Sequence, residues 1–461
     1  MKNDKYIKAD YVLLFGKIYT LDKYSRICTS IAINDGKIIF VGSNIDAFNY
    51  IGPKTKVINL KGKMVLPSFS DSNMYPLGNI LTENYDVNLS DDEKAKYYPK
   101  LSDEQYIDSF LKFQTEMHSL GITSISSVYI NSISDFTPYR IYEKLIKENK
   151  LKLRVAYSEN IHPNIEKDGH LVTFKEQIDD LVSKRAEIKD KSPYFKFTSG
   201  NIYMDNFVHN KSDYLCIPDE NNSLINLEEN YKCNLWQNNK DDLKFVITEL
   251  NNLGFQARFH SIDSESIKFI LDIFEEVSAP NNYLSRNLLN NIQSITKEDI
   301  QRIRKFKLIA SLGNLNDKEA SHEYQLKSLL DEKVLVSGAS YSPLSLSPNP
   351  IISMQKYLSK NFYDAESNNL RPTSSINGSN YLLSKDNLIS VMDIIRIFTK
   401  NSAYANFMDD EIGSLEVNKR ADLIVLDTNL LEMNISELHK ANVLMTFFDG
   451  EIVYIKQGFN I

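Results

Sequence analysis

The sequence predicts an α/β fold: a (β/α)8 TIM-like barrel joined to a small composite β-sandwich formed by the N- and C-terminal segments. Short strand-like runs with turn signals occupy both ends of the chain, and between them β-like runs alternate with stretches of helical period. Repeated β-α units favour a parallel sheet, and a closed barrel is its natural arrangement over about 330 residues. We therefore expect residues 1–66 and 405–461 in the sandwich and residues 67–404 in the barrel.

The two ends of the chain predict one β-unit. Residues 30–33 form a strand-like run that leads into Asn34-Asp35-Gly36, a signal for a tight β-hairpin, after which residues 37–41 form a second strand-like run. Matching strand-like runs return near the C-terminus, at residues 421–427, 443–448 and 451–454.

The middle of the chain predicts the barrel, because helical stretches there precede strand-like runs. The predicted helices span residues 141–150, 242–253, 297–306 and 322–331, and strands follow from residues 151, 255, 308 and 334. Two polar, irregular segments, near 80–110 and 200–235, are expected to pass over the barrel mouth.

Composition excludes several classes of protein. The net charge of −8 is spread along the chain without a Lys/Arg block that could follow a phosphate backbone, so we expect no nucleic-acid partner. No apolar run approaches the roughly 18 to 20 residues of a membrane span, and we expect a soluble, cytoplasmic protein. The cysteines Cys28, Cys216 and Cys233 have no metal-ligand spacing, which argues against a disulfide scaffold or a zinc finger.

Three groups of residues carry a likeness to a known family: 9–22 with 35–42, then 63–67 leading into Asp71, and finally 401–405 followed by 411–423 and 450–454. Together they resemble the YtcJ-like branch of the amidohydrolase superfamily, also called amidohydrolase family 3. The resemblance implies one or two divalent metals, such as zinc, at the C-terminal ends of the barrel strands, and hydrolysis of amide or other C–N bonds. Because members often form dimers, it also implies a homodimer.

The first barrel strand of the family ends in Asp-x-His-x-His-Pro, whose two histidines share one strand face and reach the same metal. Here the corresponding residues read DSNMYP. Asp71 and Pro76 fix the register, whereas Asn73 and Tyr75 replace the histidines. An amide oxygen and a phenol with a reference pKa of about 10 are poor zinc ligands beside imidazole.

The fourth strand of the family carries a metal-bridging lysine in a Lys-x-x-x-Asp-Gly pattern. Counting back from Gly200 puts Phe195 at the lysine and Ser199 at the aspartate. Lys196 is one residue away and would face the opposite side unless a bulge turns it. Whether Phe195 or Lys196 faces the barrel interior stays open, with a solvent-side or interhelical lysine as the simpler interpretation of Lys196.

The fifth strand of the family carries two alternate histidines. In this chain His260 fits the second one and Arg258 replaces the first. Alternation puts Gln256, Arg258 and His260 on one strand face. His260 is thus the one family-type ligand that these positions retain, and zinc needs three or four protein donors.

The sixth and eighth strands of the family supply a metal histidine and an aspartate, the general base. Asn291 stands at the histidine, in a register supported by a capping box from Thr296 to Asp299. Ser340 or Tyr341 stands at the aspartate, and residues 334–350 contain no Asp or Glu that another register could supply.

These replacements predict a pseudoenzyme that keeps the fold without the metal, needs no cofactor and lacks metal-dependent activity. Arg258 and His260 would form the polar pole of a pocket for a small, anionic molecule. The plainer alternative is that Arg258 pairs with a loop acid and His260 is a buried, hydrogen-bonded histidine. A second functional interpretation is an active hydrolase of amide C–N bonds with a rebuilt, metal-free site around His260, Tyr75 and Tyr341.

Overall fold

A computed structural model gives the fold of this chain. It describes residues 6–76, 102–128, 138–163, 166–167, 170–189, 191–204, 236, 240–260, 264–277, 282–290, 292, 295–313, 326–342, 347–359, 361–364, 369–372 and 389–460. The predicted pocket residue Asn291 lies outside the described residues.

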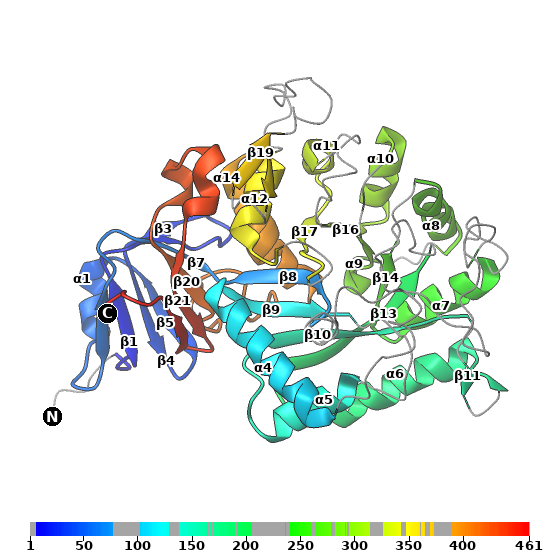
Figure 1. Ribbon diagram of the computed structural model, residues 1–461, viewed down its shortest axis with the longest axis horizontal. Coiled ribbons are helices and arrows are strands. Elements are labelled where there is room, and N and C mark those ends of the chain that lie inside the picture. Colours follow the sequence, from blue (N-terminus) through cyan, green and yellow to red (C-terminus); the bar gives the residue numbers. More distant parts are fainter. Residues whose placement is uncertain are drawn as a thin grey trace.

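Strands from both ends of the chain build two sheets that pack on each other (Figure 1). One sheet has the order β5-β4-β1-β6 and the other the order β22-β21-β20-β7-β2-β3. Their strands are β1 (Tyr11–Leu14), β2 (Lys17–Tyr19), β3 (Ile27–Cys28), β4 (Ser30–Asn34), β5 (Lys37–Gly42), β6 (Lys56–Asn59), β7 (Met64–Pro67), β20 (Leu423–Leu426), β21 (Val443–Phe448) and β22 (Glu451–Ile455). Leu13 and Ile31 of the first sheet share an apolar core with Val65, Val425 and Met445 of the second.

The hairpin predicted at Asn34-Asp35-Gly36 is confirmed, because β4 and β5 pair antiparallel across it. Asp35 and Gly36 have φ angles of 49° and 74°, the left-handed conformation that both central residues of a type I′ turn require. Short helical segments also belong to the terminal segments of the chain: α1 (Asn44–Ala47), η1 (Phe48–Tyr50), η4 (Leu430–Glu432) and η5 (Ile435–Lys440).

Among the described residues, eight parallel strands form one sheet in the order β17-β16-β15-β14-β13-β10-β9-β8. These strands are β8 (Phe69–Met74), β9 (Ile122–Ser127), β10 (Arg154–Asn160), β13 (Phe195–Tyr203), β14 (Gln256–His260), β15 (Leu288–Asn290), β16 (Ile309–Leu312) and β17 (Val336–Gly338). Two further short hairpins pair β11 (Glu166–Lys167) with β12 (His170–Leu171) and β18 (Asn361–Asp364) with β19 (Asn369–Pro372).

The first and last strands of this sheet meet at their C-terminal ends. The Tyr341 amide donates to the Asn73 carbonyl at 3.0 Å, and the Tyr75 amide donates to the Ser342 carbonyl at 2.9 Å. The sheet is thereby a nearly closed barrel, and the predicted fold class is confirmed.

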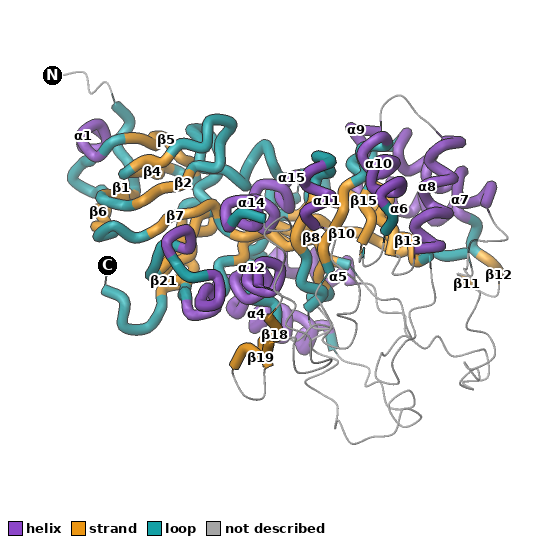
Figure 2. Tube along the Cα trace, turned by 90° about the horizontal axis from the view of Figure 1, so that it is seen from above, coloured by secondary structure: helices purple, strands orange, loops and turns teal. Residues whose placement is uncertain are grey.

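Helices cover the outside of the barrel (Figure 2). They are α4 (Asp103–Ser119), α5 (Pro138–Lys147), α6 (Phe174–Ile188), α7 (Lys240–Asn252), α8 (Ser264–Val277), α9 (Asn282–Ser285), α10 (Lys297–Lys305), α11 (Leu326–Asp331), α12 (Pro350–Ser359), α14 (Val391–Arg396) and the π-helix η3 (Ile397–Asn401). The short α15 (Ser402–Ala405) instead meets the start of β14, where the Ala405 carbonyl accepts from the Gln256 side chain. The capping box predicted from Thr296 to Asp299 starts α10, as expected. Within the described ranges, no helix is both long and apolar enough to cross a membrane.

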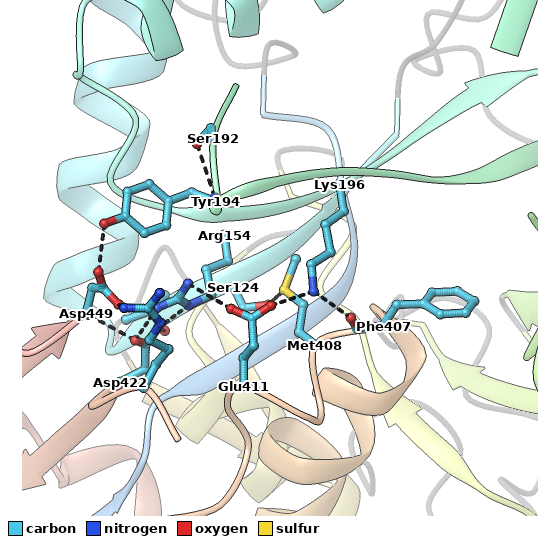
Figure 3. Close-up of polar contacts among 12 residues, drawn as sticks. Ser124, Arg154, Ser192, Tyr194, Lys196, Phe407, Met408, Glu411, Asp422 and Asp449 are labelled. Atoms are coloured by element: carbon cyan, nitrogen blue, oxygen red, sulfur yellow. Dashed lines mark hydrogen bonds and ion pairs between the residues drawn. The ribbon is translucent and has the colours of Figure 1, made fainter. Parts of the chain in front are cut away.

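A buried ionic network joins the N-terminal ends of the barrel strands to the second sheet of the terminal unit (Figure 3). Arg154, which begins β10, donates from Nε and Nη2 to the two carboxylate oxygens of Asp422 at 2.9 and 2.8 Å. Its Nη2 also lies 3.0 Å from Asp449 Oδ1, and Glu411 lies 3.7 Å from Nη1. Burial alone would lower the pKa of Arg154, but the carboxylates, Asp422 foremost, raise it above its usual value. The network therefore holds the two parts of the molecule together at the end of the barrel opposite the candidate site.

Candidate functional site

The candidate site lies where the barrel strands end, and β14 supplies its centre. Gln256, Arg258 and His260 are fully buried, as is the whole of β14. Phe259, on the other face, packs edge-on against Phe274 of α8 with ring centroids 5.8 Å apart. The alternation predicted for this strand is therefore observed, with the three polar side chains on the face opposite Phe259.

Arg258 has two partners within the described residues. Its Nη1 donates to Gln256 Oε1 at 3.1 Å, and its Nη2 donates to the carbonyl oxygen of Ser72 on β8. Nε has no partner among the described residues. Burial lowers the pKa of Arg258 to about 10, so the guanidinium stays charged at neutral pH.

His260 is held as a neutral imidazole. Its Nε2 lies 3.1 Å from the Asn290 amide nitrogen, and the Tyr203 ring is tilted 30° against it with centroids 4.6 Å apart. Burial and then the charge of Arg258 lower the pKa of His260 to about 3. With the Asn290 amide oriented so that its nitrogen faces His260, Nε2 accepts and the ring proton is on Nδ1. Nδ1 has no partner among the described residues.

In the sequence Asp71 served only to fix the register of the first strand, but in the structure its carboxyl group lies among the site residues. Its Oδ1 accepts from the backbone N–H of Asn73 and its Oδ2 from the backbone N–H of Ser340, both at 2.8 Å. Burial raises the pKa of Asp71 to about 7, against these hydrogen bonds and the charge of Arg258. A carboxylate from the first strand thus reaches the end of the last strand. The signal in the sequence was an acidic residue within a predicted barrel strand, which the structure shows to be buried along its whole length.

The predicted residues of the first and last strands come together. Asn73, Tyr75, Ser340 and Tyr341 are all buried, and the rings of Tyr75 and Tyr341 lie 6.5 Å apart. The Tyr341 ring also lies 6.5 Å from His260. Burial raises the pKa of Tyr75 above its usual value, so its hydroxyl stays protonated. Tyr341 has φ 58°, a costly conformation for an aromatic residue at this junction.

Phe195 does not lie with the other predicted pocket residues. Its ring packs against Tyr142 of α5 and Tyr157 of β10, with centroids 5.1 and 5.6 Å apart, between the barrel and its helices. Lys196 instead donates to the Phe407 carbonyl at 3.1 Å and to Glu411 Oε1 at 2.6 Å (Figure 3). Neither residue therefore contributes to the group around Arg258 and His260, to which β13 contributes Tyr203, against the His260 ring, and Ser199, bonded to Gln256.

In the part of the chain that the structure describes, no three His, Cys, Asp or Glu side chains gather as a metal-binding group. Buried serine hydroxyls instead occupy the adjoining barrel interior. Ser72 Oγ lies 3.0 Å from both Ser311 Oγ and Ser337 Oγ and donates to the Gly338 carbonyl at 2.9 Å.

The sequence matches a known protein family over most of its length. The family model described as "Amidohydrolase family" matches residues 76–454. The chain belongs to the amidohydrolase family. The family resemblance stated from the sequence is thereby confirmed.

Individual relatives of this amidohydrolase-family chain are distant. The putative amidohydrolase YtcJ of Bacillus subtilis is 21% identical over 404 residues, 84% of this chain and 67% of that protein. Imidazolonepropionase of Streptococcus gordonii is 21% identical over 411 residues, covering 87% of this chain and 84% of that protein. N-substituted formamide deformylase of Arthrobacter pascens is 36% identical over 76 residues, but the match spans 16% of this chain and 14% of the deformylase.

Solved structures support the same fold. Atrazine chlorohydrolase TrzN from Arthrobacter aurescens TC1, complexed with zinc, superposes with a TM-score of 0.68 at 11% identity over 97% of both chains. An uncharacterized metal-dependent hydrolase from Pyrococcus furiosus has a TM-score of 0.64 at 15% identity, covering 92% of this chain and 100% of that one. At these identities the likeness establishes the fold.

Proposed function

We propose that this chain is a metal-independent member of the amidohydrolase family that binds a small anionic molecule at the barrel mouth without hydrolysing it. The observation that carries the proposal is a pair of unpaired donors in neighbouring positions of one strand. Arg258 Nε and His260 Nδ1 are buried and have no partner among the described residues. A buried donor without a partner costs about 1–3 kcal/mol, which an oxygen placed between the two would offset.

The described residues around Arg258 do not fit a divalent ion. Zinc needs three or four donors, and His260 already accepts from Asn290 through Nε2. A permanently charged guanidinium beside it would repel a cation, and the same charge attracts an anion. We therefore assign no role to a metal in this chain.

The ligand we propose is a small carboxylate. Its oxygens can accept from Arg258 Nε and His260 Nδ1, and charge-assisted hydrogen bonds of this kind are the stronger ones. The rings of Tyr203 and Tyr341 have their centroids 4.6 and 6.5 Å from that of His260, and the Tyr75 ring lies 6.5 Å from that of Tyr341. These rings would pack against the apolar part of the molecule.

Titration calorimetry with acetate, propionate and benzoate tests the proposal on the full chain. Saturable binding is expected. The variant His260→Phe keeps a ring against Tyr203 but removes the Nδ1 donor, and it should weaken binding about tenfold, the worth of one such hydrogen bond. The control His439→Phe changes a histidine that is bonded to Gln355, away from the site, and should bind as the wild type does. If none of the three carboxylates binds, buried water is the natural partner of these donors and the proposal is wrong.

A second candidate function is an active, metal-free hydrolase of amide C–N bonds. Asp71 supports it, because a carboxyl group with a pKa of about 7 is suited to proton transfer near neutral pH. Assays of N-acyl amino acids and cyclic ureas, with and without added metal, separate the two candidates. Turnover without metal that Asp71→Asn abolishes would favour the hydrolase.

The expected homodimer stays a prediction, which sedimentation analysis tests.

A further inference from the structure

Arg258 reaches across the barrel. It lies on β14, and its guanidinium donates to the Ser72 carbonyl on β8. In the order of the sheet, three strands separate β8 from β14 on one side and three on the other, so these strands stand opposite each other. The side chain therefore connects two walls of the barrel that share no ladder hydrogen bonds.

The near end of this connection is fixed by Gln256. Its Oε1 accepts from Arg258 Nη1 and from Ser199 Oγ of β13, each at 3.1 Å. Its amide nitrogen donates to the Ala405 carbonyl of α15 at 3.2 Å. Because these other bonds fix the Gln256 side chain, the guanidinium that donates to it is held in one position.

The far end of the connection carries a balancing charge. Ser72, whose carbonyl accepts from Arg258, is directly bonded to Asp71, whose side chain is 2% exposed. Burial raises the pKa of Asp71, and the charge of Arg258 lowers it. Asp71 in turn accepts from the Ser340 amide, across the junction of β8 with β17. Without this cation the buried Asp71 would keep its proton to a higher pH, so Arg258 favours the ionised carboxylate. The junction of β8 with β17 is therefore stabilised in part by the positive charge of Arg258, which comes from β14 on the opposite side of the barrel.

We infer that Arg258 is a positioning residue that serves as a built-in cation, tying β14 to β8 and balancing the Asp71 carboxylate at the junction of the first and last barrel strands. The inference rests on the proposed absence of a metal. At the strand ends the family resemblance implies a divalent ion, and in this chain the guanidinium of Arg258 supplies the positive charge there.

A double-mutant cycle on the full chain tests this role by thermal unfolding without ligand at pH 8.5, between the pKa of about 7 of Asp71 and that of about 10 of Arg258, where both groups are ionised. Arg258→Met should lower the Tm by roughly 3–10 °C, since it leaves Asp71 buried without its counter-charge. Arg258→Lys keeps the charge and loses the planar fork of hydrogen-bond donors, so its Tm should lie between those of Arg258→Met and the wild type. The control Arg140→Met removes an arginine whose side chain is 63% exposed and should leave the Tm unchanged.

The charge component is read from Asp71→Asn. This substitution should lower the Tm less in the Arg258→Met background than in the wild type, because the carboxylate it removes is already uncompensated there. Equal losses in both backgrounds, or an Arg258→Met protein as stable as the wild type, would overturn the inference. If Arg258→Met does not fold, the same comparison in the Arg258→Lys background should show undiminished loss from Asp71→Asn, and a diminished loss there contradicts a charge role.

A gain-of-binding experiment tests the exchange of guanidinium for metal. The triple variant Asn73→His, Tyr75→His, Arg258→His would combine with His260 to give four imidazoles on two facing strands. Purified with zinc, it should retain one ion per chain and gain thermal stability from zinc, whereas Asn73→His, Tyr75→His with Arg258 intact should do neither. A folded triple variant that binds no zinc would contradict the exchange. Metal found in the wild type would instead refute the proposed function, so the two failures are distinguishable.

Discussion

Removing Asp422 should weaken the molecule more than any surface substitution. Its carboxylate is fully buried and accepts from Arg154 Nε and Nη2, from Thr123 Oγ1 at 3.0 Å and from the Asp449 amide at 2.9 Å. Asp422→Ala removes two charge-assisted bonds from an arginine that is 1% exposed. Asp449 remains near this guanidinium and offsets part of the loss. We therefore expect the free energy of unfolding to fall by about 3–4 kcal/mol, within the range for breaking a buried ion pair.

Urea unfolding at pH 7, followed by far-UV circular dichroism, measures this loss. Asp422→Asn, which keeps the shape and removes the charge, should account for most of it. The matched control is Asp179→Ala, because Asp179 pairs with Lys175 on the surface, with side chains 59% and 66% exposed. That control should cost less than about 0.5 kcal/mol. A loss below about 1 kcal/mol for Asp422→Ala would refute the view that this network joins the two parts of the molecule.

Three further substitutions test charged groups, two within the site and one outside it. Because the pKa of Asp71 is raised from 3.8 to about 7, its contribution to stability falls as pH rises between these values, and urea midpoints should show Asp71→Asn becoming less destabilising toward pH 7. The pKa of His260 is lowered from 6.5 to about 3, so its stabilising effect is lost as pH falls through this range. His260→Gln should therefore be less destabilising, relative to wild type, at pH 4 than at pH 7. Lys196→Met breaks a partly exposed pair with Glu411, should cost less than about 1 kcal/mol, and should leave carboxylate binding unchanged.

The fold could be predicted because its signals are local. The hairpin at Asn34-Asp35-Gly36, the cap at Thr296 and the alternation along β14 each depend on neighbouring residues, and each is observed. Predicted helix ends differ by a few residues from the observed ones: the helix expected at 141–150 is α5, Pro138–Lys147.

The site was less predictable because it depends on bulges and on strand closure. Counting back from Gly200 assumed a regular strand, but the pairing of β10 with β13 shifts between Tyr157 and Ser158, leaving Thr198 as an extra residue. Beyond that shift β13 continues to Tyr203, inside the segment expected to leave the barrel near residue 200. The contact of Asp71 with Ser340 joins residues 269 positions apart, which no local pattern reveals.

The metal content of the wild-type chain tests the central claim most directly. Protein produced in medium supplied with zinc, manganese and iron, and purified without chelators, should be analysed by inductively coupled plasma mass spectrometry. Because Arg258 supplies the positive charge at this position, we expect far less than one ion per chain and no change in Tm on adding zinc. One tightly held ion per chain, with a higher Tm when zinc is added, would contradict the account.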